Sequence, residues 1–561
     1  MQRGMTRREV LRTGVAGAAA VAVGFGPLGR NGEAWADDGQ NASKNADENA
    51  NENEGPPGRT GHDEGDRHDD DGVVERSIGS LQRSMRKGEL TAVDLVTAYV
   101  ERIARLDKAG PTVNSIIELN PDALKIAAAL DRERRRRGPR GPLHGIPIVV
   151  KDNIATADAM QTTAGSLALV GAKVPADAAL VANLRRAGAI VLGKTNLSEW
   201  ANFRSFNANS GWSGRGGLTV NPYLLTHSAC GSSSGSGAAI AASFAAAAVG
   251  TETDGSITCP AALCGIVGIK PTQSIMPGAG IVPLAHSQDT AGPMGRTVAD
   301  VAALLPGLTG ERADTYTRRL RKGALRGARI GVARQFFGTA DDPFTAETAP
   351  VWDAALSALR DAGAILVDPV VVPNVDRYFD TELTVLLYEF KADINAYLAG
   401  LVSSPVRSLA DLIAFNNANA ATELTYFDQS IFDAAEATTD LTDPVYLDAL
   451  ATDLRFSRGE GLDQVLREQR LDALVWPTSG PAWKVELGKG DTFNSVGTTS
   501  PPAVAGYPHV TVPAGFDGPL PLGFSIVGPA GSDARMLAYA YAFEQTIEAR
   551  RPPRYLGTRP V

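Results

Sequence analysis

The chain has 561 residues, of which 43% are hydrophobic and 21% charged, a composition typical of a globular protein with room for several domains. No apolar run downstream of the N-terminus reaches the length of a membrane-spanning helix, so we expect no stable membrane span. The net charge of −9 arises mainly in residues 37–72, and a nearly neutral remainder lacks the basic face that nucleic-acid binding requires.

Residues 1–36 have the pattern of an export signal. Thr6–Leu11 resembles a twin-arginine motif, an apolar stretch follows from Gly14 to Phe25, and Ala34–Ala36 places small residues where a signal peptidase cuts. Residues 37–72 are rich in Asn, Asp, Glu and Gly and cannot bury enough apolar surface to become ordered, so we interpret them as a solvated acidic linker. The sequence therefore predicts an exported protein with one folded domain at 73–561.

From Val73 onward, predicted helices and strands alternate. Gly88 ends the first helix, and Thr91 with Asp94 resembles a capping box that starts the second. The arginine run at 132–137 is expected to be the solvated end of a helix. Helices are predicted at 74–86, 91–106, 121–137 and 177–187, and strands at 113–119, 142–151 and 189–193. This alternation predicts an α/β fold.

Two segments carry the residues most able to do chemistry. The apolar strand at 142–151 ends on Lys151, which it would deliver to the edge of a sheet, although a lysine at a strand end often points into water. The stretch from Cys230 to Cys264 contains a Gly/Ser run, an Ala-rich segment at 238–248 that we predict to be helical, a short strand, and Ser256 in a tight turn. Such a turn can aim several backbone N–H groups at one point, which suits an oxyanion hole.

Together these motifs resemble the amidase signature family. The family pairs a lysine on a GIP-x-x-x-KD strand with one serine in a G-S-S-G-rich loop and another in a GT-x-x-GGS turn, and the matching residues here are Lys151, Ser232 and Ser256. The 24-residue interval between the two serines is the one that the family keeps, and the similarity covers essentially residues 75–548. The resemblance implies a single large α/β domain with a mixed central sheet covered by helices on both faces.

The resemblance also implies a mechanism. Ser256 would be the nucleophile, and Lys151, neutral through burial, would be the base acting through Ser232. The peptide bond between Gly231 and Ser232 would be cis, and Ser233 would donate or accept a hydrogen bond at the Lys151 amine. The oxyanion would be bound by the backbone N–H groups of Thr253, Asp254, Gly255 and Ser256.

The motif departs from the common family pattern at one position, where Asp254 replaces a glycine. A left-handed conformation there would strain an aspartate mildly, and we interpret its side chain as structural. The motifs look most like the peptide amidase-like branch, so the expected substrate is the C-terminal amide of peptides or a similar linear carboxamide, with aryl acylamides and small aliphatic amides as alternatives. Neither a metal nor an organic cofactor is implied, and the sequence carries no indication of the oligomeric state.

Three other functions compete with this interpretation. Gly231–Gly235 formally fits the nucleophile elbow of an α/β-hydrolase with Ser233 at its centre, but no apolar strand precedes it, and His286 and His509 are the histidines that follow it. A non-catalytic binding protein of the same fold would be expected to lack one of the three matching residues. The tRNA-amidating subunit of the family works with cytoplasmic partners, which conflicts with an export signal.

The remaining expectations concern cysteines and the later chain. Cys230, Cys259 and Cys264 are interpreted as small buried residues that line a packed turn, rather than as a zinc site. Export to an oxidising compartment would permit a disulfide, and one between Cys259 and Cys264 is left open. The segment 388–432 is expected to set substrate specificity, and the aromatic residues near 378–390 to lie mostly in the core. Further strands are predicted at 324–333, 365–372, 472–477, 509–513 and 522–527, and helices at 350–362, 378–398 and 532–547.

Overall fold

A computed structural model describes residues 72–339 and 343–559. The export signal predicted at 1–36 and all but the last residue of the linker predicted at 37–72 lie outside the described residues. At the centre of the molecule is an 11-stranded sheet, with a separate two-stranded hairpin beside it. No helix in the two described ranges is both long enough and apolar enough to cross a membrane.

The central sheet is mixed. Its strand order is β1-β3-β2-β6-β8-β7-β12-β13-β11-β9-β10, with parallel pairing from β3 through β2 to β6 and from β11 through β9 to β10, and antiparallel pairing elsewhere. The strands are β1 Ile116–Leu119, β2 Pro147–Lys151, β3 Ile190–Thr195, β4 Trp212–Ser213, β5 Gly217–Leu218, β6 Ala247–Glu252, β7 Val267–Lys270, β8 Thr290–Gly295, β9 Arg329–Ala333, β10 Ile365–Val370, β11 Ala473–Pro477, β12 His509–Asp517 and β13 Leu520–Val527.

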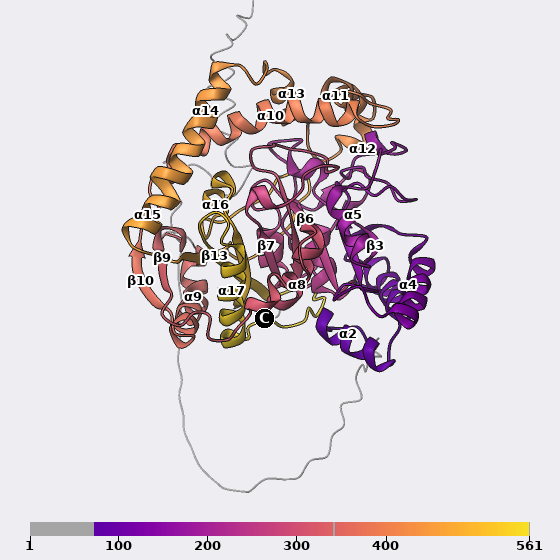
Figure 1. The fold of residues 1–561 in the computed structure, drawn as a ribbon. Coiled ribbons are helices and arrows are strands. Elements are labelled where there is room, and N and C mark those ends of the chain that lie inside the picture. The colour runs from indigo at the N-terminus through magenta and orange to yellow at the C-terminus, as the bar shows by residue number, and fades with distance from the viewer. Residues whose placement is uncertain (1–71, 340–342, 560–561) are drawn as a thin grey trace, which may run out of the picture.

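Helices cover both faces of this sheet. In the view of Figure 1, α8 and α17 lie in front of it, and α10, α11 and α13 form a layer over its upper end. α6 packs against β2 and β6, and α7 packs against β7, β12 and β13. The helices are α2 Ile78–Lys87, α3 Ala92–Arg102, α4 Ala123–Arg137, α5 Ala179–Arg186, α6 Ser234–Ala241, α7 Thr258–Leu263, α8 Val298–Thr309, α9 Pro343–Asp361, α10 Phe379–Ala399, α11 Leu409–Ala418, α12 Ala420–Glu423, α13 Ser430–Glu436, α14 Pro444–Leu454, α15 Asp463–Glu468, α16 Ser500–Ala505 and α17 Asp533–Ile547. The predicted single large α/β domain with a mixed central sheet is confirmed.

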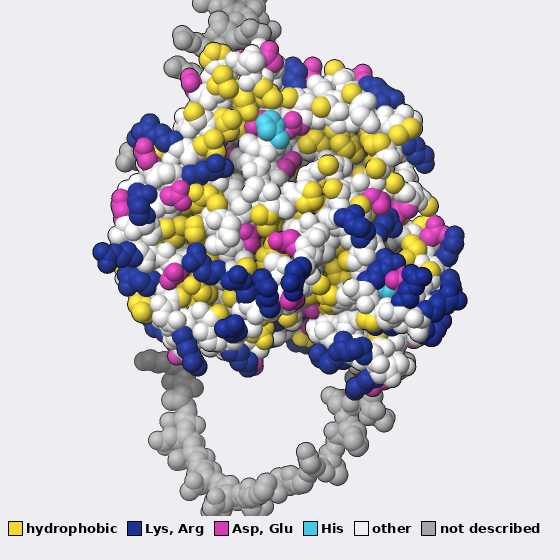
Figure 2. Space-filling view, viewed as in Figure 1, with side chains coloured by type: hydrophobic (Ala, Val, Ile, Leu, Met, Phe, Trp, Pro, Cys, Tyr) yellow, Lys and Arg dark blue, Asp and Glu magenta, His cyan; other side chains and the backbone are white. Residues whose placement is uncertain are grey.

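Local sequence signals explain several element boundaries. Gly88 ends α2 in the left-handed conformation, and the capping box of Thr91 and Asp94 starts α3. Four arginines fill the last turn of α4, where their charge suits the helix dipole, and Figure 2 shows Lys and Arg side chains gathered at the lower right, over the position of α4 in Figure 1. The predicted solvated helix end is therefore largely confirmed, with Arg134 half-buried against the His144 carbonyl.

One predicted element is wrong at both ends. The helix expected at 238–248 is α6, which begins earlier, at Ser234, and ends at Ala241. Residues 247 and 248 instead begin β6, in which every residue is buried. Alanine is compatible with either state, so the Ala-rich sequence did not show where the helix stops, and pairing of β6 between β2 and β8 decides the matter.

Two hydrophobic clusters support the architecture. The larger one contains the sheet and the helices on its faces, and the second lies beneath α10, α11 and α13. Within the second cluster Phe390 stacks on Phe432 and contacts Phe203 edge-on. Of the four aromatic residues at 378–390, Tyr378 and Phe390 are buried whereas Phe379 and Tyr388 are half-buried, so the expectation that most lie in the core is met for half of them. The α10 layer is thereby fixed above the end of the sheet at which β2 and β6 finish.

Candidate active site

Lys151 is the last residue of β2, an interior strand of the sheet, and its side chain is fully buried. Its Nζ donates hydrogen bonds to Ser232 Oγ at 2.7 Å, to Thr251 Oγ1 at 2.8 Å and to the Thr251 carbonyl at 3.2 Å. Burial lowers the pKa of Lys151 from 10.5 to about 7, although Asp289 and Glu252 raise it in part. The structure thus places the amine at the predicted serine, in an environment that favours its neutral form.

Ser232 lies in a tight loop that leads into α6. The Gly231–Ser232 peptide bond is cis, as the family resemblance implied. Gly231 packs so closely that a Cβ there would overlap the Ser198 hydroxyl, which explains why the position requires glycine. The Ser198 N–H donates to the Ser232 carbonyl at 3.0 Å and fixes the loop from its other side.

No hydrogen bond joins Ser233 to Lys151 among the described residues, so the predicted hydrogen bond between them is wrong. Its hydroxyl donates to the Thr251 carbonyl at 3.1 Å and accepts from the Thr251 N–H at 3.2 Å. Thr251 is the residue that contacts the Lys151 amine instead, and Asn153 donates to the same Thr251 hydroxyl at 3.0 Å. Thr251 precedes the predicted oxyanion turn in the motif GTETDGS, so its place in that motif was the available signal.

Ser256 follows the turn that ends β6 and is 8% exposed. Gly255 has a φ of +78°, in the left-handed region that glycine adopts freely, whereas Asp254 is not among the residues with positive φ. The strain considered for Asp254 therefore does not arise. The Ser233 N–H donates to the Ser256 carbonyl at 3.1 Å and joins the two serine loops. Within residues 72–339 and 343–559, the backbone N–H groups of 253–256 donate to no protein acceptor.

The Asp254 side chain turns away from this point and anchors the loop. Its two carboxylate oxygens accept from Thr499 Oγ1 at 2.5 Å and from Ser500 Oγ at 2.6 Å, at the start of α16. Burial raises the pKa of Asp254 to about 7, and burial beside Asp254 raises the pKa of Glu382 well above its usual range. These contacts agree with the structural role expected for the side chain.

We expect Asp254→Asn to lower the free energy of unfolding by about 1–3 kcal/mol, because an amide nitrogen cannot accept the second hydroxyl donor. Denaturant unfolding followed by circular dichroism would measure the loss. Ser500→Ala is the matched variant, because it removes one hydroxyl donor and leaves the Asp254 carboxylate bonded to Thr499. It should lower the free energy of unfolding by less than Asp254→Asn does. An unchanged unfolding midpoint combined with loss of catalytic activity would show that the carboxylate takes part in the chemistry.

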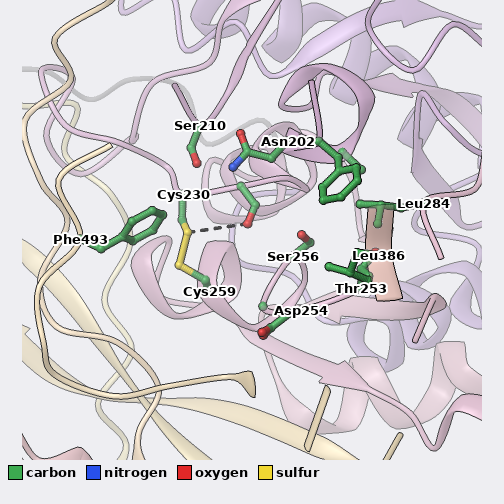
Figure 3. Close-up of a pocket in the computed structure, with 14 residues that line it drawn as sticks. Asn202, Ser210, Cys230, Thr253, Asp254, Ser256, Cys259, Leu284, Leu386 and Phe493 are labelled. Carbon is green, nitrogen blue, oxygen red and sulfur yellow. Dashed lines mark hydrogen bonds between the residues drawn. A yellow bond between two sulfur atoms is a disulfide. The ribbon is translucent and has the colours of Figure 1, made fainter. Parts of the chain in front are cut away.

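Ser256 lines a pocket that is formed by chain segments far apart in the sequence. Figure 3 shows Asn202 and Ser210 on one side of it, Leu284, Leu386 and Thr253 on another, and Phe493 beside a disulfide. The pocket has a volume of about 40 Å³, and a second cavity of about 380 Å³ shares Ala201, Thr253 and Leu284 with it. The two cavities are therefore neighbours that meet at these three residues.

The walls of the pocket differ from the prediction. The segment 388–432 was expected to set specificity, but it contributes no residue to the smaller pocket and only Asp393 and Ala396 to the larger one. α10 reaches the smaller pocket through Leu386, just before that segment. The loops at 201–203 and 284 and the side chain of Phe493 form most of the remaining apolar wall, and no motif marked them because each belongs to a different part of the chain.

The three cysteines have two different states. Cys230 and Cys259 form a disulfide with Cα atoms 6.0 Å apart, and both line the Ser256 pocket. Cys264 is a buried free thiol. All three are buried, as expected, but Cys230 and Cys259 are also joined by a disulfide that the sequence interpretation did not assign.

The histidines of the elbow hypothesis lie in other contacts. His509 is buried in β12 with Nε2 2.6 Å from Ser525 Oγ, and burial lowers its pKa to about 3. His286 is half-exposed and has Nδ1 2.9 Å from Asp393 Oδ2 and Nε2 3.3 Å from Glu389 Oε1. These contacts, and the bonding of Ser233 to the Thr251 backbone, speak against the elbow hypothesis.

His286, Glu389 and Asp393 could also offer three donor atoms to a metal ion, since these atoms lie within 4.8 Å of one another. In the structure the His286 ring instead contacts the carboxylates of Glu389 and Asp393 directly. The hydrogen bond to Asp393 raises the pKa of His286, with Glu389 adding to the effect, so the cluster is an ion pair that joins the 284–289 loop to α10. Glu389 is further bound by the Tyr446 hydroxyl at 2.8 Å.

Comparisons with known proteins give a consistent result. A family model described as Amidase matches residues 94–537. A crystal structure of native peptide amidase from Stenotrophomonas maltophilia is 48% identical and superposes with a TM-score of 0.81, covering 86% of this chain and 99% of that one. An amidase family protein from Bacillus anthracis is 36% identical with a TM-score of 0.77, covering 86% and 93% of the two chains. A probable amidase of Arabidopsis thaliana is 38% identical over 507 residues, 86% of this chain and 92% of that protein.

Proposed function

This chain belongs to the amidase family and is a hydrolase of carbon–nitrogen bonds, and from that premise we propose that Ser256 cleaves carboxamides with Lys151 and Ser232 as its proton-transfer partners. The observation that carries the proposal is the 2.7 Å contact between Lys151 Nζ and Ser232 Oγ inside a fully buried environment. A lysine with a pKa of about 7 is partly neutral at ordinary pH and can accept a proton.

The proposed reaction begins with the Ser256 hydroxyl. As its oxygen attacks the carbonyl carbon, its proton passes to Ser232, while the Ser232 proton passes to the Lys151 amine. The tetrahedral intermediate then collapses, the carbon–nitrogen bond breaks, and the nitrogen leaves as ammonia after receiving the proton back through Ser232. Water next attacks the acyl group on Ser256 by the same proton path and releases the carboxylic acid.

The charge that develops on the carbonyl oxygen needs hydrogen-bond donors. The N–H groups of Thr253, Asp254, Gly255 and Ser256 are suited to this role because they follow the end of β6 in a tight turn and lack protein acceptors among the described residues. The left-handed Gly255 allows that turn, and the Asp254 carboxylate holds it against α16. Loss of one such donor typically costs on the order of 100-fold in rate.

For the substrate, we propose the C-terminal amide of peptides or a similar linear carboxamide. The similarity to peptide amidases, including a crystal structure with the competitive inhibitor chymostatin at 49% identity, supports this choice. The narrow pocket at Ser256 suits a small unsubstituted amide nitrogen, and the adjoining cavity, with Met276, Ile281 and Leu284 on its wall, offers space for an apolar acyl portion.

The substrate proposal predicts a ranking of amides. The purified chain should release ammonia from C-terminally amidated peptides with a kcat/KM at least about 10-fold above that for small aliphatic amides or an aryl anilide, because those fill less of the two cavities or present a bulky leaving group. Coupled detection of ammonia, with aniline release measured separately, gives the ranking. Turnover restricted to the anilide or to small amides would overturn the peptide assignment and leave amide hydrolysis in place.

We also propose that the chain is exported by way of a twin-arginine-type signal. The pattern of residues 1–36 supports this proposal, and so does the disulfide between Cys230 and Cys259, since disulfides persist mainly in oxidising compartments.

A further inference from the structure

The disulfide between Cys230 and Cys259 joins the two loops that carry the serines of the proposed triad. Cys230 lies two residues before Ser232, and Cys259 lies three residues after Ser256. We propose that this disulfide is a positioning element, which holds the Ser232 hydroxyl in register with the Ser256 hydroxyl. The inference rests on the function proposed above. A disulfide has no proton to give, so it acts through the two serines.

Each half of the disulfide is attached to the loop that it serves. The Cys259 N–H donates to the Gly255 carbonyl at 2.8 Å, directly at the proposed oxyanion turn. On the other side, the Cys230 N–H donates to Ser228 Oγ at 3.0 Å, and the Cys230 carbonyl accepts from the Ser234 hydroxyl at the start of α6. A displacement of either cysteine would therefore reach the neighbouring serine through short, hydrogen-bonded segments.

The disulfide also forms a wall of the reaction pocket. Figure 3 shows it beside Ser256, with Phe493 packed on its outer side. Cys230 and Cys259 are only 2% and 6% exposed, and they pack with an apolar cluster that includes Leu224, Leu263 and Trp483. The bond thus fixes the two serine loops to each other and to rigid core on the side away from the substrate.

The loop before α6 needs such a constraint. Gly231 lies between Cys230 and Ser232, and a glycine gives the backbone more accessible conformations than other residues, so the position of the Ser232 hydroxyl depends on what holds the neighbouring residues. Hydrogen bonds from Ser233 to the Ser256 carbonyl and to the Thr251 backbone join the loops on one side, and the disulfide joins them on the other side of Ser232. The Ser232 hydroxyl is thus held from both directions along the chain, and the covalent link cannot stretch as a hydrogen bond can.

Cys264 provides a matched control. It lies five residues beyond Cys259, is fully buried, and is a free thiol with its Sγ 3.8 Å from the Ala229 carbonyl. Cys264→Ala also removes a buried sulfur atom from this region, but it leaves the disulfide between Cys230 and Cys259 intact. A fall in activity shared by Cys264→Ala would point to lost packing, and one confined to the disulfide variants would point to positioning.

The test compares the full chain with the double variant Cys230→Ala/Cys259→Ala and with Cys264→Ala. The readout is the rate at which an alkyl fluorophosphonate labels Ser256, located by mass spectrometry. In this reaction the serine oxygen forms a bond to phosphorus, the phosphorus–fluorine bond breaks, and the serine proton leaves through Ser232. The rate does not depend on which amide is the substrate. Ammonia release from an amidated peptide, with kcat and KM resolved, is measured in parallel.

We expect the double variant to label Ser256 at least about 10-fold more slowly and to lose kcat by a similar factor, because a displacement near 1 Å can cost on the order of 100-fold in rate. KM should change by less than about twofold, since the wall loses a small group and no polar contact to the substrate. Cys264→Ala should keep the labelling rate of the unmodified chain. If the double variant fails to fold by circular dichroism, the unmodified chain is reduced with dithiothreitol and labelled without alkylation, and its new thiols are counted by mass in a parallel sample.

Equal labelling rates in the double variant and the unmodified chain would overturn the inference, even if the melting temperature fell, because a purely structural cross-link lowers stability without slowing Ser256. A slow double variant accompanied by an equally slow Cys264→Ala would overturn it as well. Failure of the proposed function has a different signature: rapid labelling of Ser256 in the unmodified chain, with no ammonia released from any amide. Absence of labelling in the unmodified chain would contradict both the positioning role of the disulfide and the proposed function of Ser256.

Discussion

Replacing Ser256 by alanine should lower kcat for amide hydrolysis by roughly 10⁴- to 10⁶-fold, because no other group can then form the acyl intermediate. The alanine side chain leaves the turn, the Asp254 anchor and the disulfide in place, so the variant should fold normally. Ammonia release and intact-mass detection of the acyl-enzyme during turnover would both measure the effect.

Ser233→Ala is the informative companion to that variant. Its hydroxyl bonds the Thr251 backbone and not a base, so its loss should reduce kcat by no more than about 10-fold through displacement of Thr251. Activity that survived in Ser256→Ala and vanished in Ser233→Ala would reject the proposed triad and restore the elbow hypothesis. Equal and complete loss in both variants would instead require unfolding to be excluded by circular dichroism.

Lys151→Met should lower kcat by about 10²- to 10⁴-fold, the range expected for loss of a positioned general base. Methionine fills most of the same buried volume without the amine, so the loss reports proton transfer rather than packing.

The pH dependence of kcat/KM gives a second test of Lys151 as the base. Burial lowers the pKa of Lys151 to about 7, and only the neutral amine can accept a proton. In the unmodified chain kcat/KM should therefore reach its plateau above about pH 7 and fall as the pH drops through that value, and Lys151→Met should lose this dependence.

Lys270→Met is the matched control for this experiment. Lys270 is also fully buried, burial lowers its pKa to about 8, and its Nζ donates to the Pro271 carbonyl at 3.3 Å. The control should retain kcat within a few-fold and keep the pH dependence. A comparable loss of kcat in both variants, or an unchanged pH profile in Lys151→Met, would contradict the assignment of Lys151 as the base.

Much of the fold could be predicted from local patterns. The capping box at Thr91 and the glycine stop at Gly88 are local signals, because a cap needs only residues within one turn, and the structure confirms both. The Ala-rich stretch that becomes α6 and β6 carried no such signal. Alanine fits the buried face of either element, so the boundary depended on strands β2 and β8, which come from other parts of the chain.

The sequence indicated some residues of the candidate site, and only the structure revealed others. The family resemblance indicated Lys151, Ser232 and Ser256, and the structure brings Lys151 and Ser232 into contact and places Ser256 in the adjoining loop. It could not show that Thr251, rather than Ser233, binds the amine. That choice depends on which side of β6 faces the end of β2, a matter of register between strands about 100 residues apart in sequence.

By itself the sequence determined the order and spacing of the reactive residues, the glycine that permits the turn before Ser256, and the membership of the chain in its family, because these are properties of covalent structure and of short-range conformation. Only the tertiary structure decided that Cys230 pairs with Cys259, that Asp254 anchors its loop on Thr499 and Ser500, and that the Lys151 pKa falls to about 7. Pairing requires two distant segments to meet, and a pKa depends on how completely the surrounding chain removes water from the charge.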